Sequence, residues 1–262
     1  MKSLLLSGLV LASLGTGCVM EDLDSDENSL AGLNYVAQGD SYASGTGTRE
    51  YYDSGCQRSN HSYAKQLAAQ RGMTLNHIAC SGARIPDVRN NQLGALSAST
   101  NLVTISIGGN DAGFSSVITQ CAKPWPYTCT TEISNARNFI NNTLPGQLNS
   151  LYTDIDTRAP NARVIVVGYP RLFNGEECNL LARISPTEQA DLNGVADLLA
   201  SKISAAAAAH GFEFLDTRTP FNTHRICDDV EWLNGLSNPV GESYHPNQIG
   251  HDGLTNLLNA ML

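Results

Sequence analysis

Four short polar segments of the chain carry residue types that act in nucleophilic catalysis. A serine hydroxyl becomes a nucleophile when a neighbouring base takes its proton. The negative charge that then develops on a substrate oxygen needs fixed hydrogen-bond donors. The segments contain a serine, a histidine, an asparagine and several glycines. They are Gly39-Asp40-Ser41, Cys80-Ser81-Gly82, Gly108-Gly109-Asn110-Asp111 and Ser243-Tyr244-His245-Pro246.

Alternating strands and helices are predicted around these segments. Short apolar runs predict strands at residues 35–38, 74–79, 102–107, 163–167 and 212–215, and helical patterns cover residues 62–71, 186–209 and 247–262. The apolar run 163–167 is typical of a strand buried on both faces of a parallel sheet. We therefore expect one α/β domain. Because ligands bind beyond the carboxyl ends of such strands, the polar segments belong at that edge.

The motifs together resemble those of the GDSL, or SGNH, hydrolase family. The resemblance covers residues 33–262 in the family's order, through residues 39–45 (GDSYASG), Gly82, residues 109–111 (GND) and residues 245–247 (HPN). It implies a three-layer α/β/α, flavodoxin-like fold with a central parallel sheet of about five strands. It also implies hydrolysis of carboxylic esters. The placement of Cys56 and Cys80 is similar to that in the secreted lipase and esterase branch found in actinobacteria.

The resemblance also implies a role for each motif residue. Ser41 is the nucleophile, His245 is its general base, and the oxyanion hole consists of the backbone N–H groups of Ser41 and Gly82 with the side-chain amide of Asn110. Glycine at position 82 lets the backbone approach the substrate closely. Asp40 is expected to order the turn through backbone donors. The competing interpretation makes Ser41 and Asn110 helix caps and Gly82 a turn glycine.

The third member of the triad departs from the family pattern. Many members carry aspartate three residues before the histidine, and Glu242 stands at that position here. A glutamate can orient an imidazolium as aspartate does, so Glu242 is the predicted acid. A main-chain carbonyl of the same loop is the alternative.

No metal site and no cofactor are expected. His251 follows His245 by six residues, but no third ligand matches this pair, and we expect His251 to be a structural hydrogen-bond partner. The chain also lacks GxGxxG and GxxxxGK[ST], which argues against a nucleotide-binding domain.

The cysteines predict disulfide bonds and export. Setting Cys18 aside leaves six of the seven cysteines, for which fifteen pairings exist. Our hypothesis is sequential pairing, since Cys121 and Cys129 flank a short loop that a bridge would pin. The predicted bridges are Cys56–Cys80, Cys121–Cys129 and Cys178–Cys227. A Cys56–Cys80 bridge would hold the Gly82 loop. Three disulfides imply an oxidising compartment.

The N-terminus resembles a targeting segment. Lys2, a short apolar stretch and small residues precede Cys18, so residues 1–18 are a predicted signal segment and residues 19–32 an acidic spacer. Two interpretations of Cys18 stay open. Either the cysteine is lipidated and tethers a lipoprotein to the bacterial cell surface or the periplasmic membrane face, or an ordinary signal peptide is removed and the protein is secreted.

The composition limits the partners. A net charge of −9 disfavours nucleic acid and anionic lipid headgroups. We expect a monomer that acts on a small-molecule or lipid ester; the alternative function is a catalytically silent surface lipoprotein that binds glycan or lipid. Lipase, esterase, phospholipase and carbohydrate deacetylase activities all stay open. Aromatic residues that could line an acyl groove or pack in the core are Tyr42, Phe114, Trp125, Tyr127, Phe173 and Trp232.

Overall fold

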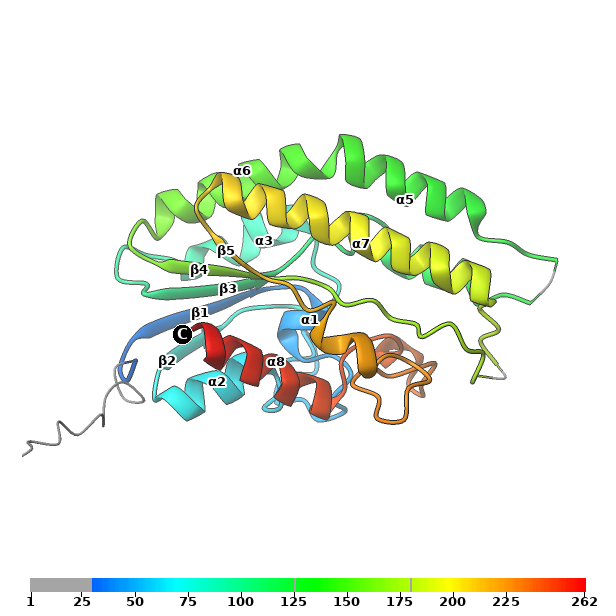
Figure 1. Cartoon of the computed structure of the whole chain (residues 1–262). Helices are drawn as coiled ribbons and strands as arrows, with labels where there is room; N and C mark the ends of the chain where they lie inside the picture. Colours follow the sequence, from blue (N-terminus) through cyan, green and yellow to red (C-terminus); the bar gives the residue numbers. More distant parts are fainter. Residues whose placement is uncertain (1–29, 125, 180) are drawn as a thin grey trace, which may run out of the picture.

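The computed structural model describes residues 30–124, 126–179 and 181–262, arranged around one parallel β-sheet (Figure 1). The predicted signal segment, Cys18, Trp125 and all but the last three residues of the spacer lie outside the described residues. The strands are β1 (Asn34–Gly39), β2 (Thr74–His77), β3 (Leu102–Ser106), β4 (Arg163–Val167) and β5 (Glu213–Leu215). They lie in the order β2-β1-β3-β4-β5 and all pairs are parallel. This is the flavodoxin-like order, so the predicted α/β fold is confirmed.

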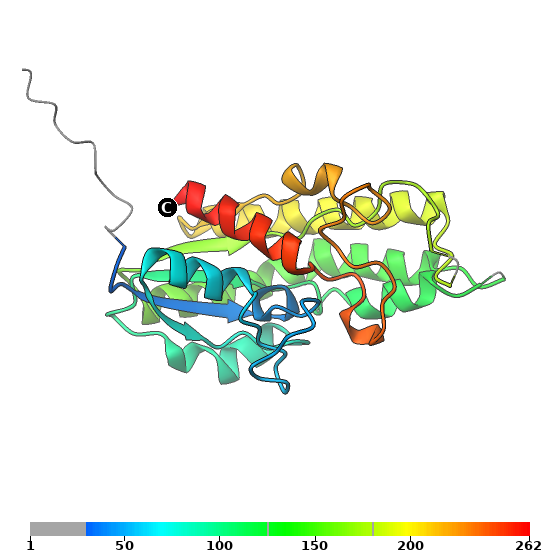
Figure 2. The ribbon, with the colours of Figure 1, turned by 90° about the horizontal axis from the view of Figure 1, so that it is seen from below.

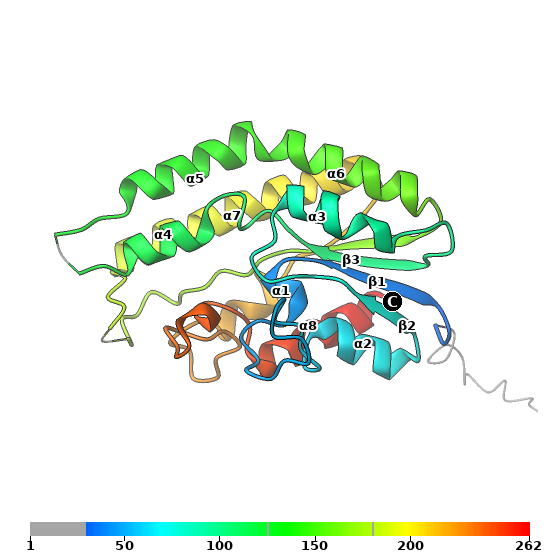
Figure 3. The same ribbon diagram turned by 180° about the vertical axis from the view of Figure 1, so that it is seen from behind.

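Helices cover both faces of the sheet. The α-helices are α1 (Ser41–Ser44), α2 (Tyr63–Arg71), α3 (Ile85–Asn91), α4 (Phe114–Cys121), α5 (Thr130–Asn142), α6 (Leu144–Arg158), α7 (Pro186–Ala209) and α8 (Gln248–Met261). Three 3₁₀-helices are η1 (Leu93–Ala95), η2 (Pro220–Thr223) and η3 (Val240–Glu242). Helices α2 and α8 lie side by side on one face (Figure 2), and α3, α5, α6 and α7 lie on the other (Figure 3).

The strand sequences explain this two-sided burial. Tyr35 and Ala37 of β1 pack in the cluster that contains α2 and α8, whereas Val36 between them packs in the cluster that contains α3 and α6. Successive side chains of a strand point to opposite faces, so a strand covered on both sides is expected to be largely apolar. Strand β3 is buried along its whole length, and β4 is buried after Arg163.

Helix caps account for the predicted helix ends. The side chain of Ser62 accepts from the backbone of Lys65 at the start of α2, which ends at Gly72. Ser185 and Glu188 form a capping box at the start of α7, and Asn247 caps α8. The predicted strands and the three predicted helices are all present, with ends within two residues of the predicted ones. Helices α3 to α6 were not predicted from the sequence.

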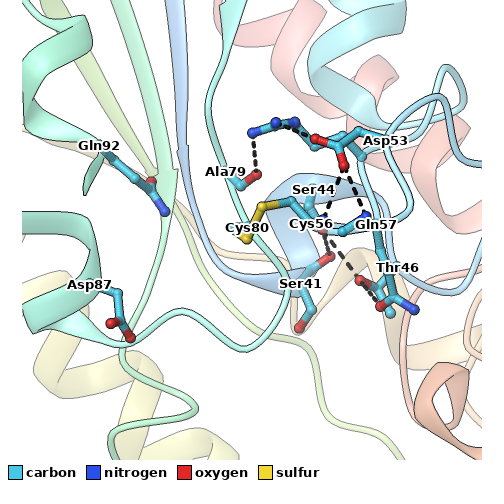
Figure 4. The surroundings of a disulfide bond; sticks show 12 residues. Ser41, Ser44, Thr46, Asp53, Cys56, Gln57, Ala79, Cys80, Asp87 and Gln92 are labelled. Carbon is cyan, nitrogen blue, oxygen red and sulfur yellow. Dashed lines mark hydrogen bonds and ion pairs between the residues drawn. A yellow bond between two sulfur atoms is a disulfide. The ribbon is translucent and has the colours of Figure 1, made fainter. Parts of the chain in front are cut away.

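Three disulfide bonds join the cysteines in the predicted sequential pairs: Cys56–Cys80, Cys121–Cys129 and Cys178–Cys227. The first lies beside Ser41 (Figure 4), and the backbone N–H of Ser81 donates to the carbonyl of Cys56. This bridge therefore ties the loop after β2 to the loop that follows α1. Within the described ranges, no helix has both the length and the apolar character needed to cross a membrane.

Candidate active site

Ser41 and His245 meet beyond the carboxyl end of β1. Ser41 is the first residue of α1, directly after that strand, and His245 lies in the loop between η3 and α8. The Ser41 hydroxyl donates to His245 Nε2 across 2.8 Å, although the two residues are 204 positions apart. Ser41 is only 6% exposed. This is the contact that a serine nucleophile and its base require.

The second nitrogen of His245 settles its tautomer. Nδ1 lies 2.9 Å from the carbonyl oxygen of Ser243, which can only accept a hydrogen bond. Nδ1 therefore carries the proton, and Nε2 presents a lone pair to Ser41. Burial lowers the pKa of His245 to about 4, against the opposing effect of the Ser243 and Glu242 carbonyls. The imidazole is thus neutral at physiological pH and able to take a proton.

The three predicted oxyanion donors lie on neighbouring loops. Because Ser41 begins α1, its N–H has no acceptor within the helix. Gly82 has φ of +81° in the exposed loop before α3, and its N–H has no protein acceptor among the described residues. Asn110 lines the pocket beside Ser41 and donates from Nδ2 to the carbonyl of Ala83 at 3.0 Å. That bond fixes the Asn110 amide relative to the Gly82 loop.

Asp111 holds the same loop from the other side. Its carboxylate accepts from the backbone N–H of Ile85 at 3.0 and 3.2 Å, at the first residue of α3. Burial raises the pKa of Asp111, and the bond from Ile85 opposes this shift. Two consecutive residues of the loop after β3, Asn110 and Asp111, thus form hydrogen bonds with the segment that follows β2.

A pocket opens from Ser41 toward the face of the sheet that α5 and α7 cover. It encloses about 750 Å³ of empty space, its open mouth included, and Ser41, Asn110 and His245 lie on its wall. The rest of the wall is mainly apolar and comes from α4, α5, α7 and the segment after β4. Its apolar residues include Phe114, Val117, Ala136, Leu172, Leu192, Val195, Ala196 and Leu199.

Comparison with known proteins identifies the family of this chain. The model of the GDSL-like lipase/acylhydrolase family matches residues 37–252. The chain belongs to this family. It is 41% identical to Lipase 1 of Streptomyces coelicolor over 253 residues, which is 95% of this chain and 93% of that protein.

Two solved structures have the same fold. The extracellular lipase of Streptomyces rimosus is 40% identical with a TM-score of 0.83, and phospholipase A1 of Streptomyces albidoflavus is 38% identical with a TM-score of 0.83. Each comparison covers 88% of this chain and 100% of the other chain. As a GDSL-like hydrolase with lipase relatives, the chain is a carboxylic ester hydrolase.

Glu242 does not occupy the position of a triad acid in this GDSL-like hydrolase. Its carboxylate accepts from the Tyr51 hydroxyl at 2.7 Å and pairs with Arg49 at 3.5 Å. His245 Nδ1 donates instead to the carbonyl of Ser243. The predicted contact between Glu242 and His245 is therefore wrong, and the main-chain alternative is the one present. The side chain of Glu242, the last residue of η3, points to the loop of Tyr51, whereas the carbonyl of the next residue, Ser243, faces the imidazole.

Asp40 of the GDSL-like motif bonds to the turn rather than to His245. Its Oδ1 accepts from the backbone N–H of Tyr42 at 3.0 Å, as expected, and its Oδ2 accepts from the Tyr169 hydroxyl at 2.5 Å. Burial raises the pKa of Asp40 to about 7, and the bond from Tyr169 opposes this shift. Sequence reasoning missed Tyr169. The available signal was a polar residue two positions after the strand 163–167, at the predicted ligand-binding edge.

The remaining candidates have varied positions. Of the aromatic candidates, Tyr42 and Phe114 line the pocket, Phe173 packs in the core, and Trp232 stacks on His224. Tyr127 is exposed. His251 is fully buried and accepts from the backbone N–H of Tyr63 at 3.2 Å, which confirms its structural hydrogen bond.

Proposed function

We propose that this protein is a serine esterase or lipase that cleaves carboxylic esters through an acyl-enzyme on Ser41. The observation that carries the proposal is the 2.8 Å contact between Ser41 Oγ and His245 Nε2 at the wall of an apolar pocket. A serine with a neutral, oriented imidazole beside it can be deprotonated as it attacks a carbonyl.

The residues divide the reaction into two acyl transfers. Ser41 Oγ attacks the ester carbonyl while Nε2 of His245 takes its proton, and the carbonyl of Ser243 stabilises the imidazolium at Nδ1. Backbone N–H groups of Ser41 and Gly82 and the amide of Asn110 receive the oxyanion. The imidazolium then protonates the leaving alcohol. Water, deprotonated by the same imidazole, then attacks the acyl carbonyl, and the imidazolium returns the proton to Ser41 Oγ as its bond to the acyl group breaks and the acid is released.

The pocket supports an apolar acyl chain as the recognised part of the substrate. Its wall beyond Ser41 consists largely of aliphatic side chains, which favour alkyl groups over sugars or charged groups. The names of the relatives, lipase and phospholipase A1, agree with this assignment. A lipid ester is therefore the proposed substrate class, with short-chain esters as poorer substrates.

Secretion is part of the proposal. Residues 1–18 resemble a signal segment, the three disulfides suit an oxidising compartment, and the related Streptomyces rimosus enzyme is extracellular. Lipidation of Cys18 would tether the enzyme through its new N-terminus. Mass spectrometry of the mature N-terminus distinguishes a diacylated Cys18 from a free polypeptide end.

Labelling and mutation of Ser41 test the catalytic proposal. A fluorophosphonate should add once to the protein, on Ser41, and abolish hydrolysis of p-nitrophenyl butyrate. Ser41→Ala should lower kcat by at least about a thousandfold. Full turnover by Ser41→Ala would remove the proposal. Wild-type protein that binds esters without cleaving them would instead identify a catalytically silent binding protein.

A further inference from the structure

Tyr169 contacts two of the three loops that carry proposed oxyanion donors. It follows β4 by two residues and is 7% exposed. Its hydroxyl donates to Asp40 Oδ2 at 2.5 Å and accepts from the backbone N–H of Gly109 at 3.3 Å. Asp40 precedes Ser41, and Gly109 precedes Asn110. One hydroxyl thus joins the residues immediately before two of the three proposed donors.

The fit around this hydroxyl is close. A Cβ atom at position 109 would lie 3.2 to 3.4 Å from ring and hydroxyl atoms of Tyr169, so glycine there lets the loop rest on the tyrosine. On its other side, the Tyr169 ring packs edge-on against Tyr42 with 5.0 Å between the ring centres. Tyr42 in turn donates to the carbonyl of Tyr244, the residue before His245. The Ser41 and Asn110 segments therefore contact Tyr169 directly, and the His245 segment is linked to it through Tyr42.

Asp40 fixes the position of the Tyr169 hydroxyl. Its carboxyl group is 1% exposed, and its two oxygens have different partners: the Tyr42 backbone and the Tyr169 hydroxyl. A buried carboxyl group depends on such bonds, because water does not reach it. Loss of the tyrosine hydroxyl would leave Asp40 Oδ2 and the Gly109 N–H without these bonds, and either group could recover a partner only by moving its loop.

We propose that Tyr169 and Asp40 form a positioning pair that sets the spacing of the oxyanion donors on the Ser41 and Asn110 loops. The inference rests on the proposed function. Neither residue touches the reacting atoms in this role. The pair acts by holding the Ser41 N–H and the Asn110 amide at the separation that the tetrahedral intermediate requires, so its effect belongs to the transition state rather than to substrate binding.

Tyr169→Phe is the direct test, with Tyr152→Phe as its matched control. Tyr152 is likewise a core tyrosine and is fully buried, but its hydroxyl has no hydrogen-bond partner among the described residues and it lies on α6. With p-nitrophenyl butyrate, Tyr169→Phe should lower kcat by about tenfold to a hundredfold and leave KM within about twofold. The inhibition constant of an alkyl boronic acid, which forms a tetrahedral adduct on serine, should rise by the same factor. Tyr152→Phe should change none of these quantities.

The other outcomes separate the two proposals. If Ser41→Ala is inactive but Tyr169→Phe matches Tyr152→Phe, the positioning role is wrong and the proposed function stands. A rise in KM without loss of kcat would make Tyr169 only a part of the pocket wall. Activity of Ser41→Ala would overturn the proposed function itself.

A second variant covers the case in which Tyr169→Phe does not fold. Asp40→Asn keeps the shape of the side chain and should reproduce the loss of kcat and of boronic acid affinity at unchanged KM. Where both variants fold, the double variant should lose no more than the larger single loss, because the residues act as one unit. Losses that multiply would overturn the pair.

Discussion

The hydrogen bond from His245 Nδ1 to the Ser243 carbonyl gives the imidazole its orientation without a carboxylate. A carbonyl oxygen carries no full charge, so it raises the basicity of the ring less than an aspartate would. Burial is then the dominant influence, and it lowers the pKa of His245 to about 4. At the residue scale, the proposed site therefore combines a neutral imidazole, the proposed base, with a main-chain orienting group.

This combination predicts how activity depends on pH. His245 must be neutral to accept the Ser41 proton, so activity is lost as pH falls through its lowered pKa. We expect kcat/KM for a neutral ester to rise with pH with an apparent pKa of about 4 and to be level from about pH 6. A stopped assay between pH 3 and 8 measures this. Asp40→Asn should keep the same acidic limb, and a limb near 6.5 would contradict the burial argument.

The observed contacts of Glu242 predict a modest mutational effect. Its carboxylate bonds to Tyr51 and Arg49 and not to His245. Glu242→Gln keeps an oxygen acceptor for Tyr51, so kcat should fall by less than about tenfold, whereas loss of a true triad carboxylate costs about 10⁴-fold. Steady-state kinetics beside His245→Ala, which should be nearly inactive, measures the difference. A thousandfold loss in Glu242→Gln would restore the glutamate to the triad.

At the scale of elements, three neighbouring loops after β1, β2 and β3 carry the proposed nucleophile and the proposed oxyanion donors. The loop after β2 is the most exposed of the three, and Gly82 has no helix or strand to hold it. The Cys56–Cys80 bridge, the bond from Asn110 to Ala83 and the bond from Ile85 to Asp111 give it a fixed position. The bridge is therefore expected to support catalysis as well as stability.

Removal of this bridge should affect both properties. It closes a loop with a sequence separation of 24, so replacing both cysteines by serine should lower the free energy of unfolding by about 3 kcal/mol and kcat by about tenfold. The control is removal of Cys178–Cys227, which has a separation of 49. It should cost about 4 kcal/mol with little change in kcat. Equal loss of kcat in both variants would show that the effect is general destabilisation.

The pocket wall on α7 predicts control of acyl-chain length. Ala196 lines the pocket, whereas Ala208 on the same helix is exposed and outside it. Ala196→Phe should lower kcat/KM for p-nitrophenyl palmitate by at least about tenfold, since each buried methylene contributes about 0.8 kcal/mol. Hydrolysis of p-nitrophenyl acetate should change by less than about threefold. Ala208→Phe is the control, and an unchanged chain-length profile in Ala196→Phe would place the acyl chain elsewhere.

At the scale of the whole molecule, buried histidines couple folding to pH. Burial lowers the pKa of His77 and His245 to about 4 and that of His251 to about 3. Each binds a proton in the unfolded chain below its ordinary pKa of 6.5 but stays neutral in the folded protein. Their stabilising effect is thus complete above pH 6.5 and is lost as pH falls toward 3 or 4. Asp40, with its raised pKa, acts in the opposite direction between pH 7 and 4.

Because the lowered pKa values of three histidines outweigh the raised pKa values of Asp40 and Asp111, the protein should unfold more easily in mild acid. The free energy of urea unfolding should fall between pH 7 and pH 4, and His251→Gln, which keeps an acceptor for the Tyr63 N–H, should show a drop smaller by about 3 kcal/mol. Unfolding curves at fixed pH values measure both quantities. An identical pH dependence in the variant would show that His251 does not contribute.

The amino-acid sequence by itself determined the class of fold and the chemical parts of the site. Strands that are buried on both faces are largely apolar, and the strand 163–167 shows this after Arg163. The helical patterns of residues 186–209 and 247–262 predicted α7 and α8, and the structure adds the caps at Ser185 and Asn247, whose side chains satisfy the first free N–H groups. The polar segments that follow strands predicted the edge of the sheet at which the site lies. The order of the cysteines along the chain predicted the disulfide pairs.

Only the tertiary structure decided what depends on contacts between distant segments. Helices α5 and α6 are rich in asparagine, threonine and serine, which favour helices weakly. They form because residues such as Ile140 and Leu148 pack in the hydrophobic cluster on the face of the sheet that contains α3 and α6. Likewise, the motif spacing cannot show that the Ser243 carbonyl rather than the Glu242 side chain reaches His245, or that Tyr169 reaches Asp40 across 129 positions. Local sequence sets which groups are available, whereas the turn of each loop and the burial around it determine which of them meet.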